Sequence, residues 1–295
     1  MKIDVVLLEK NLNILLKIEE KYQENYLNYY NELNKLVGYW NTTKGVSFLE
    51  NIKDEKKKID LYYSYFNDIR DVYKYLIIEY KKIGEKIFYN LDERDNIKNQ
   101  YNLYLEKINY LIEKFDNINT SNINNKISNS VYNGLLGLNN ISKSISDIVQ
   151  KFNSINDQLD NILIVVENKI NKIDINTIKL LDESEYYKRI GFNKNNNVVV
   201  DADKLENVTN IIKNLIFEEE IILDDLKNSY SDINNCFLSR LDDKFSAIEN
   251  ILVDSLVKIK NNHVIEAGLL LKEVNDVRIL EKEMIKSMSS LGDSN

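Results

Sequence analysis

Apolar residues recur at alternating intervals of three and four positions along most of this chain. One series runs over residues 8–36 with Glu19 out of pattern, and a second runs over residues 48–87 with Glu55 out of pattern. A period of 3.5 residues is typical of long helices that bury one narrow stripe against another helix. The two series therefore predict an antiparallel helical hairpin whose connection lies within residues 37–45.

The chain contains no proline among its 295 residues, although average usage of about 5% would place about 15 there. Nothing therefore obliges a helix to stop or kink, and folds that need many proline-containing turns are disfavoured. We expect an all-α, elongated fold in which long coiled-coil-like hairpins are held by narrow seams. The apolar period resumes over residues 97–118, 138–173, 205–233 and 245–288, with polar breaks at residues 119–129 and 191–197.

The two ends of the chain resemble each other. At a constant offset of 197 residues, Asp4 aligns with Asp201 and Phe48 with Phe245, and a two-residue insertion then aligns Glu50-Asn51-Ile52 with Glu249-Asn250-Ile251. Asp201 or Asp203 is expected to cap the helix of the second copy, after a brief extended segment at residues 198–200. The predicted units are a first hairpin (1–90), a helical insert (91–190), a second hairpin (198–290) and a disordered tail (291–295).

Composition excludes several classes of site. One His and one Cys do not make a zinc site of the usual ligands, and a pI near 5.0 argues against nucleic-acid binding. No phosphate loop or catalytic motif is present, so we expect no catalytic residue, no metal and no cofactor, and a protein that is not an enzyme. His263 is expected on a helix surface, and Cys236 in the core near the second turn. The tyrosine seam is expected in the core with hydroxyls that reach solvent; it comprises Tyr22, Tyr26, Tyr29, Tyr62, Tyr73 and Tyr80.

No signal peptide and no spanning segment fit the sequence, so we expect a protein secreted without a cleavable signal, or cytoplasmic before export. Residues 131–149 are the least polar part of the insert. Ser142, Lys143 and Asp147 make this segment too polar to cross a membrane. An amphipathic packing face is the favoured interpretation, with contact at a membrane surface as the alternative.

The hairpins resemble those of the Trp-x-Gly (WXG, ESAT-6-like) family of type VII secretion in Gram-positive bacteria. The resemblance is carried by an aromatic residue in the connecting turn and a Phe early in the second helix. The position two after Trp40 is Thr42 instead of Gly, and the second copy has Phe237 in place of Trp. The LXG-type substrates of the same pathway are the nearest whole-chain comparison, but the chain has no room for their toxin domain.

The resemblance implies an export signal, Tyr-x-x-x-Asp/Glu, at the end of the second helix, which the secretion ATPase reads beside the Trp turn of a partner. Tyr89 with Glu93 falls at the expected place, and Tyr75 with Glu79 also fits the pattern. Two surface residues one helical turn apart are the competing interpretation. The residues that the resemblance assigns to partner or secretion contacts are Trp40, Gly45, Phe48, Tyr89, Glu93, Phe237 and Phe245.

The leading functional hypothesis is a non-enzymatic secretion-associated protein, either a substrate or a targeting partner, that acts through helix–helix contacts. Its expected partners are another helical protein or a second copy of the chain, together with the secretion ATPase. For Trp40 the sequence also allows a purely structural role, as an aromatic plug that closes its own hairpin. The alternative functions are a membrane-active helical toxin component and a structural coiled-coil spacer.

Overall fold

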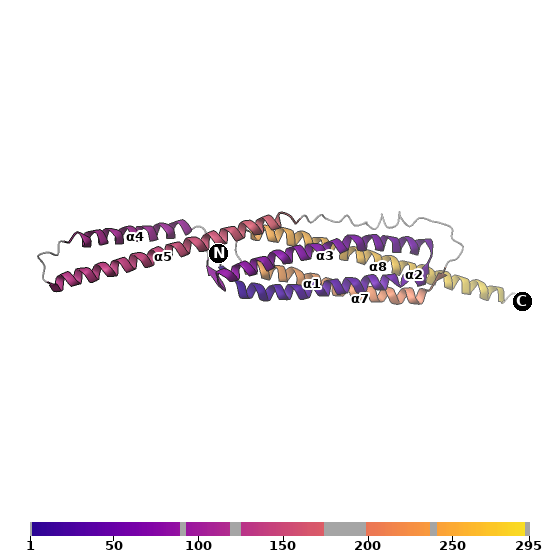
Figure 1. Ribbon diagram of the computed structural model, residues 1–295. Helices are drawn as coiled ribbons and strands as arrows, with labels where there is room; N and C mark the ends of the chain where they lie inside the picture. Colours follow the sequence, from indigo (N-terminus) through magenta and orange to yellow (C-terminus); the bar gives the residue numbers. More distant parts are fainter. Residues whose placement is uncertain (1, 89–92, 119–124, 174–198, 237–240, 293–295) are drawn as a thin grey trace.

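A computed structural model describes residues 2–88, 93–118, 125–173, 199–236 and 241–292 of the protein. The fold is all-α, as the heptad spacing predicts, and forms a long rod (Figure 1). The chain folds into helices α1 (Val5–Asn34), α2 (Leu36–Tyr39), α3 (Thr43–Ile83), α4 (Arg94–Asp116), α5 (Asn125–Ile170), α7 (Ala202–Asn234) and α8 (Asp242–Gly292), with short strands β1 (Lys2–Asp4), β2 (Trp40–Asn41), β3 (Lys86–Phe88) and β4 (Val199–Val200).

The first hairpin consists of α1 and α3, and the second consists of α7 and α8. Each begins with a short strand followed by an aspartate that caps the first helix: Asp4 accepts a hydrogen bond from the Leu7 amide, and Asp201 accepts one from the Lys204 amide. The side-chain oxygen thereby satisfies one of the amides that a helix start leaves free. The predicted extended segment before the second hairpin is confirmed as β4, and Asp201, not Asp203, is its cap.

The two hairpins pack side by side in opposite directions and form one four-helix bundle. Near one end of α1, Asn11 donates to the Asp232 carbonyl, whereas Asn25, farther along α1, donates to the Leu215 carbonyl. Higher residue numbers on α1 thus lie beside lower residue numbers on α7, so these helices are antiparallel. The apolar core consists of two clusters along the bundle, and each cluster contains residues of both hairpins.

The antiparallel arrangement has an internal two-fold relation. The Asp4 amide donates to the Cys236 carbonyl at 3.3 Å, and the Asp201 amide donates to the Tyr39 carbonyl at 2.9 Å. Because Asp201 follows Asp4 by 197 residues and Cys236 follows Tyr39 by the same number, these two bonds are equivalents of each other. The start of each hairpin is therefore joined to the turn of the other.

Burial corrects the alignment of the second halves of the repeat. The expected insertion aligns Ile52 with Ile251, but Ile52 is buried and Ile251 is exposed. The offset of 197 instead continues through α3 and α8 without an insertion. It matches buried with buried residues at Ile59 and Leu256, Tyr62 and Ile259, Phe66 and His263, Ile69 and Glu266, and Tyr73 and Leu270.

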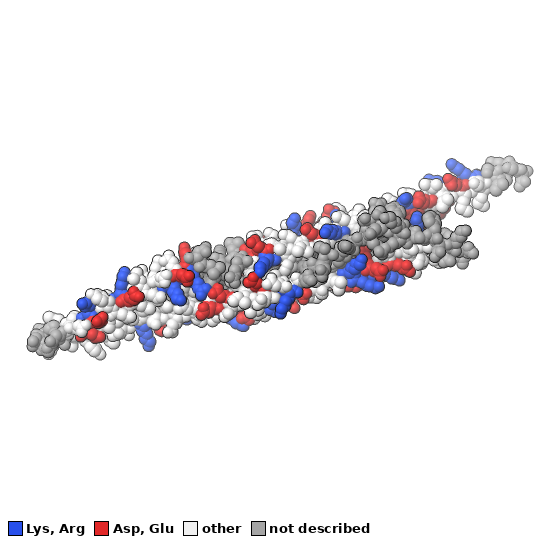
Figure 2. Space-filling view, turned by 90° about the horizontal axis from the view of Figure 1, so that it is seen from above, with Lys and Arg blue, Asp and Glu red and all other residues white. Residues whose placement is uncertain are grey.

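Helices α4 and α5 form a third hairpin that extends beyond one end of the bundle (Figure 1). The last third of α5 packs on α3, where Leu159, Ile162 and Val166 are buried. At the other end of the rod, α8 continues past the bundle. Charges of both signs alternate along the face seen in Figure 2.

Several predicted boundaries differ from the structure. Ile87 lies in strand β3 and not in the second helix, because α3 ends at Ile83; Gly84 caps it with an amide that still bonds the Tyr80 carbonyl. The expected connection at residues 37–45 contains the end of α2, strand β2 and the first turn of α3. The polar break of residues 119–129 is shorter than expected, since α5 begins at Asn125. The expected boundary loop at residues 191–197 lies outside the described residues.

Candidate functional site

The Trp40 turn lies at one end of the bundle, between the two hairpins. Strand β2 pairs with β4, which places Trp40 opposite Val200 of the second hairpin. The Trp40 ring packs on Phe48 with 5.4 Å between ring centroids, and its indole nitrogen donates to Glu273 of α8 at 3.2 Å. A methyl group on Gly45 would lie 2.2 Å from the Trp40 carbonyl oxygen. Glycine is therefore required there because the turn backbone approaches α3 too closely for any side chain.

The residues that the resemblance assigns to contacts are thus distributed unevenly. Trp40, Gly45 and Phe48 meet in the core, and Phe245 is buried at the other end of the bundle, where it stacks on Tyr73. Glu93 is exposed just before α4. Tyr89 and Phe237 lie outside the described residues.

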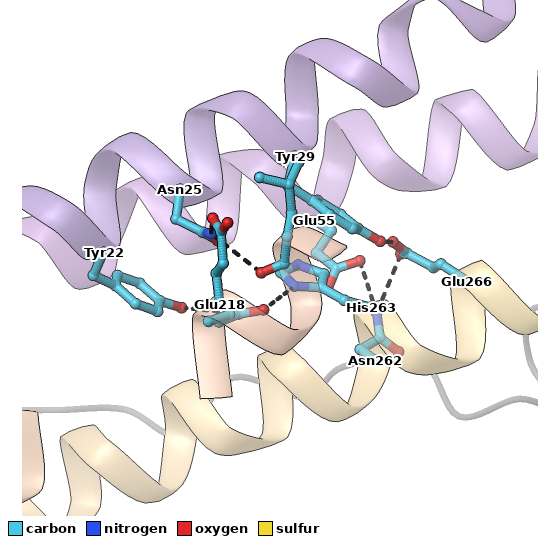
Figure 3. A network of polar contacts seen from close by, with 10 residues as sticks. Tyr22, Asn25, Tyr29, Glu55, Glu218, Asn262, His263 and Glu266 are labelled. Atoms are coloured by element: carbon cyan, nitrogen blue, oxygen red, sulfur yellow. Dashed lines mark hydrogen bonds and ion pairs between the residues drawn. The ribbon is translucent and has the colours of Figure 1, made fainter. Parts of the chain in front are cut away.

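A ladder of polar contacts joins the two hairpins through the core (Figure 3). Its donors are aromatic side chains of the first hairpin, and its acceptors are glutamates of the second. Tyr22 donates to Glu219 at 3.1 Å and Tyr29 donates to Glu266 at 2.6 Å. Tyr73 donates to Glu249, and Trp40 donates to Glu273. We call these four contacts, three from tyrosines and one from Trp40, the Tyr–Glu ladder.

His263 lies at the centre of the ladder, and its side chain is 1% exposed. The expectation of a helix-surface residue is therefore wrong. Its Nδ1 lies 2.8 Å from Glu219, and the rings of Tyr26 and Tyr29 pack against the imidazole (Figure 3). Burial opposes the charged imidazolium, but the charge and hydrogen bond of Glu219 outweigh it and raise the pKa of His263 above its ordinary value of 6.5.

Next to the histidine, Asn262 links carboxylates from both hairpins. Its amide nitrogen lies 2.7 Å from each oxygen of Glu55 and 3.4 Å from Glu266 (Figure 3). Glu55 is one of the two residues that interrupt the apolar spacing, and the structure places it in the buried seam. Its polar side chain is accommodated because a charge-assisted hydrogen bond crosses to α8.

Two further buried glutamates flank the centre of the ladder. Burial raises the pKa of Glu249 to about 8, and Asn234 of α7 donates to it at 2.6 Å. Burial also raises the pKa of Glu19, the other interruption of the spacing, to about 8, although Arg70 at 3.9 Å opposes that shift. Both carboxyl groups are therefore held in the protonated form near neutral pH.

The tyrosine seam is confirmed as core, but the expectation that its hydroxyls reach solvent is wrong for three of them. The hydroxyls of Tyr22, Tyr29 and Tyr73 donate to buried glutamates. Cys236 is buried near the second turn, as expected. A tyrosine in the core needs a partner for its hydroxyl, and the opposite hairpin supplies it.

The chemistry of the ladder is that of a specific helix–helix interface. Its titratable groups pair with one another inside the bundle, and the buried His263 meets a dissolved substrate only if the helices separate. Within the described residues, no group of three or more His, Cys, Asp or Glu is arranged to hold a metal ion. No described helix is both long enough and apolar enough to cross a membrane.

The fold and the Tyr–Glu ladder together define a class of protein: a single chain whose two dissimilar helical hairpins pack as an antiparallel bundle. The sequence matches no protein-family model, and neither the curated proteins nor the solved structures include a significantly similar one.

Proposed function

We propose that the protein is a non-enzymatic component of a type VII-like secretion pathway, a substrate or a targeting partner, that acts through helix–helix contacts. The WXG-like resemblance implies a signal built from the Trp turn of one hairpin and the end of the second helix of its partner. One observation supports this role above the others: the Trp40 turn lies against α8, the second helix of the other hairpin, through Glu273.

In this proposal one chain supplies both members of the hairpin pair. The amide of Asp4, at the start of the first hairpin, bonds Cys236 near the turn of the second, and the amide of Asp201 bonds Tyr39 in the turn of the first. Of the candidate export signal, Tyr89 lies outside the described residues, and Glu93 directly precedes α4. Glu93 is exposed there, as a residue read by an ATPase must be.

Export from a Gram-positive host with an active type VII system tests the proposal. We expect the full-length chain in the culture supernatant of the parent strain and not of a strain that lacks the secretion ATPase. Replacing Tyr89 and Glu93 together by Ala should lower export by about tenfold or more, whereas Tyr132→Ala, an exposed tyrosine of α5, should not change it. Equal export from all strains, or none from the parent, would contradict the proposal.

A co-expression experiment separates the two roles. A targeting partner should copurify with a small helical protein encoded beside it and should raise the export of that protein. A substrate should appear in the supernatant itself. Failure to find either result would leave the secretion role without support and would favour the structural spacer.

A further inference from the structure

The α4–α5 hairpin has two grooves of opposite character. Ser142 donates to Asn109 at 3.1 Å, and the Tyr101 and Phe152 rings lie 6.4 Å apart, which sets the register of the two antiparallel helices. One groove is polar and is lined by residues such as Glu113 and Ser146. At 100° per residue, the opposite groove carries six apolar side chains at seven-residue intervals. These are Tyr104 and Leu111 on α4, Ile118 two residues beyond its end, and Ile141, Ile148 and Ile155 on α5, which we call the stalk groove.

The stalk groove is a helix-packing surface that is left exposed. Its six side chains are between 38% and 52% exposed. Seven residues beyond Ile155, the same stripe of α5 reaches Ile162, which is buried against α3. The stripe is thus covered by α3 inside the bundle and by no described helix outside it. Its heptad spacing fits another helix with the same period.

Charge restricts what that helix can be. On the helical wheel, Lys107 and Lys114 of α4 and Lys151 of α5 border the stalk groove, and all three are exposed. The acidic residues Glu106, Glu113 and Asp116 lie toward the opposite side of α4. Two stalk grooves facing each other would bring lysines together, so the charges favour an amphipathic helix with acidic borders.

The other end of the same chain carries such a helix. Past Val274, the last buried residue of α8, the helix leaves the bundle (Figure 1). Val277, Leu280, Met284 and Met288 follow one another along one side at intervals of three and four, and the last three are 58% to 71% exposed. Glu281, which forms an ion pair with Arg278 at 3.3 Å, lies beside this stripe; Glu283 and Arg278 lie farther round, and Lys282 and Lys286 lie on the far side. We call residues 277–288 the α8 tail.

We propose that the stalk groove binds the α8 tail of a second copy of the chain. The lengths agree: the groove side chains of one helix span about 21 Å and the tail stripe about 17 Å at 1.5 Å per residue. The groove and the tail lie at opposite ends of the rod, and α5 and α8 run in the same direction along it (Figure 1). A second copy shifted along the rod axis therefore brings its tail to the groove of the first without turning round.

The contact is heterologous, because a groove meets a tail and each pair of bound copies leaves one groove and one tail free. Such a contact extends into an open, head-to-tail chain of rods. The acidic residues of the tail then lie against the lysines of the groove, and apolar residues of both are removed from water. This assembly is independent of the proposed role in secretion, because neither Tyr89 nor the Trp40 turn takes part in it.

Complementation between two variants of the full-length chain tests the assembly. Ile141→Asp with Ile148→Asp disables the groove and leaves the tail intact, whereas Leu280→Asp with Met284→Asp disables the tail and leaves the groove intact. All four residues are exposed, so the bundle should keep its fold, which circular dichroism and thermal unfolding check. Sedimentation velocity over a concentration series then measures association.

The unaltered chain should form species larger than a dimer as its concentration rises. Each variant alone should remain monomeric, and an equimolar mixture should form a one-to-one dimer that does not grow. Replacing Lys107 and Lys114 by Glu should weaken association about tenfold or more, and Glu281→Lys with Glu283→Lys should restore part of it. The matched controls Asn139→Asp, in the polar groove on the other side of α5, and Lys286→Asp, behind the tail stripe, should weaken it far less.

Four results would overturn the assembly. The unaltered chain stays monomeric at all concentrations; the groove variant alone still forms dimers, which indicates tail-to-tail contact; or the two variants fail to combine when mixed. Association that ends at a dimer in the unaltered chain would also contradict it, because a heterologous contact between rods does not close.

Discussion

The two hairpins share a backbone plan but bury charged residues at different positions: Glu19 and Glu55 of the first correspond to Ile216 and Leu252 of the second. At five buried positions related by the offset of 197, the first hairpin has an apolar or aromatic residue and the second has a charged or titratable one. The pairs are Tyr22 and Glu219, Ile52 and Glu249, Phe66 and His263, Ile69 and Glu266, and Leu76 and Glu273.

This division explains why the two hairpins pair with each other. The first hairpin supplies the donors of the Tyr–Glu ladder and the second supplies the acceptors. Two copies of the second hairpin would bury glutamates against glutamates, and two copies of the first would leave tyrosine hydroxyls without those acceptors. Burying an unpaired polar group costs more than a made hydrogen bond gains, so the ladder selects the mixed pair.

The largest expected effect comes from removing the central acceptor. Glu219→Leu leaves His263 and the Tyr22 hydroxyl buried without their partner, which should lower the free energy of unfolding by about 3–5 kcal/mol. The triple variant Glu219→Leu, His263→Leu, Tyr22→Phe should recover most of that loss, because no polar group then remains unpaired. Urea unfolding measures both. A triple variant no more stable than the single one would show that the cost lies in packing and not in pairing.

Buried titratable groups of both hairpins should make stability depend on pH: Glu19 in the first hairpin, and Glu249 and His263 in the second. The pKa of Glu249 is about 8 in the fold against an ordinary 4.5, so the native chain keeps a proton that the unfolded chain loses between these values. Stability therefore falls as the pH rises through this window. The raised pKa of His263 acts in the same direction, since its contribution is complete below pH 6.5 and is lost as the pH rises through the folded pKa.

Between pH 5 and pH 9, the free energy of unfolding of Glu249→Gln should fall by about 2–4 kcal/mol less than that of the unaltered chain. One pKa unit corresponds to about 1.4 kcal/mol. Glu220→Gln, an exposed neighbour of the ladder, serves as the control and should leave the slope unchanged. Chemical unfolding at several pH values gives the comparison. Equal slopes for the Glu249 variant and the unaltered chain would argue that this carboxyl does not titrate with folding.

The smallest effect is expected from removing one donor of the first hairpin. Tyr29→Phe deletes a hydroxyl that bonds a buried carboxylate, and the ring that packs on His263 remains. The expected loss is about 1.5–2 kcal/mol. Tyr132→Phe, on the exposed face of α5, should cost nothing measurable. If the two substitutions had the same effect, the Tyr29 hydroxyl would contribute no pairing energy.

Much of the fold follows from local rules. The alternating spacing predicts the long helices, and Asp4 and Asp201 mark where two of them begin. The candidate site was harder to predict. Glu19 and Glu55 were visible as interruptions of the apolar spacing, and that was the available signal for buried polar groups. His263 gave no such signal, since flanking Asn261, Asn262 and Glu266 make its surroundings in the sequence polar.

By itself, the sequence determined the elements: where helices start, which stripe of each is apolar, and that the two ends of the chain repeat. Those properties depend on residues within a few turns of one another. The tertiary structure decided which stripes meet, and so whether a polar residue faces water or a partner. In the sequence, a glutamate on an apolar seam only interrupts the apolar spacing. In the bundle it accepts a hydrogen bond from a tyrosine up to 237 residues away. Only the antiparallel packing of the two hairpins places that tyrosine beside it.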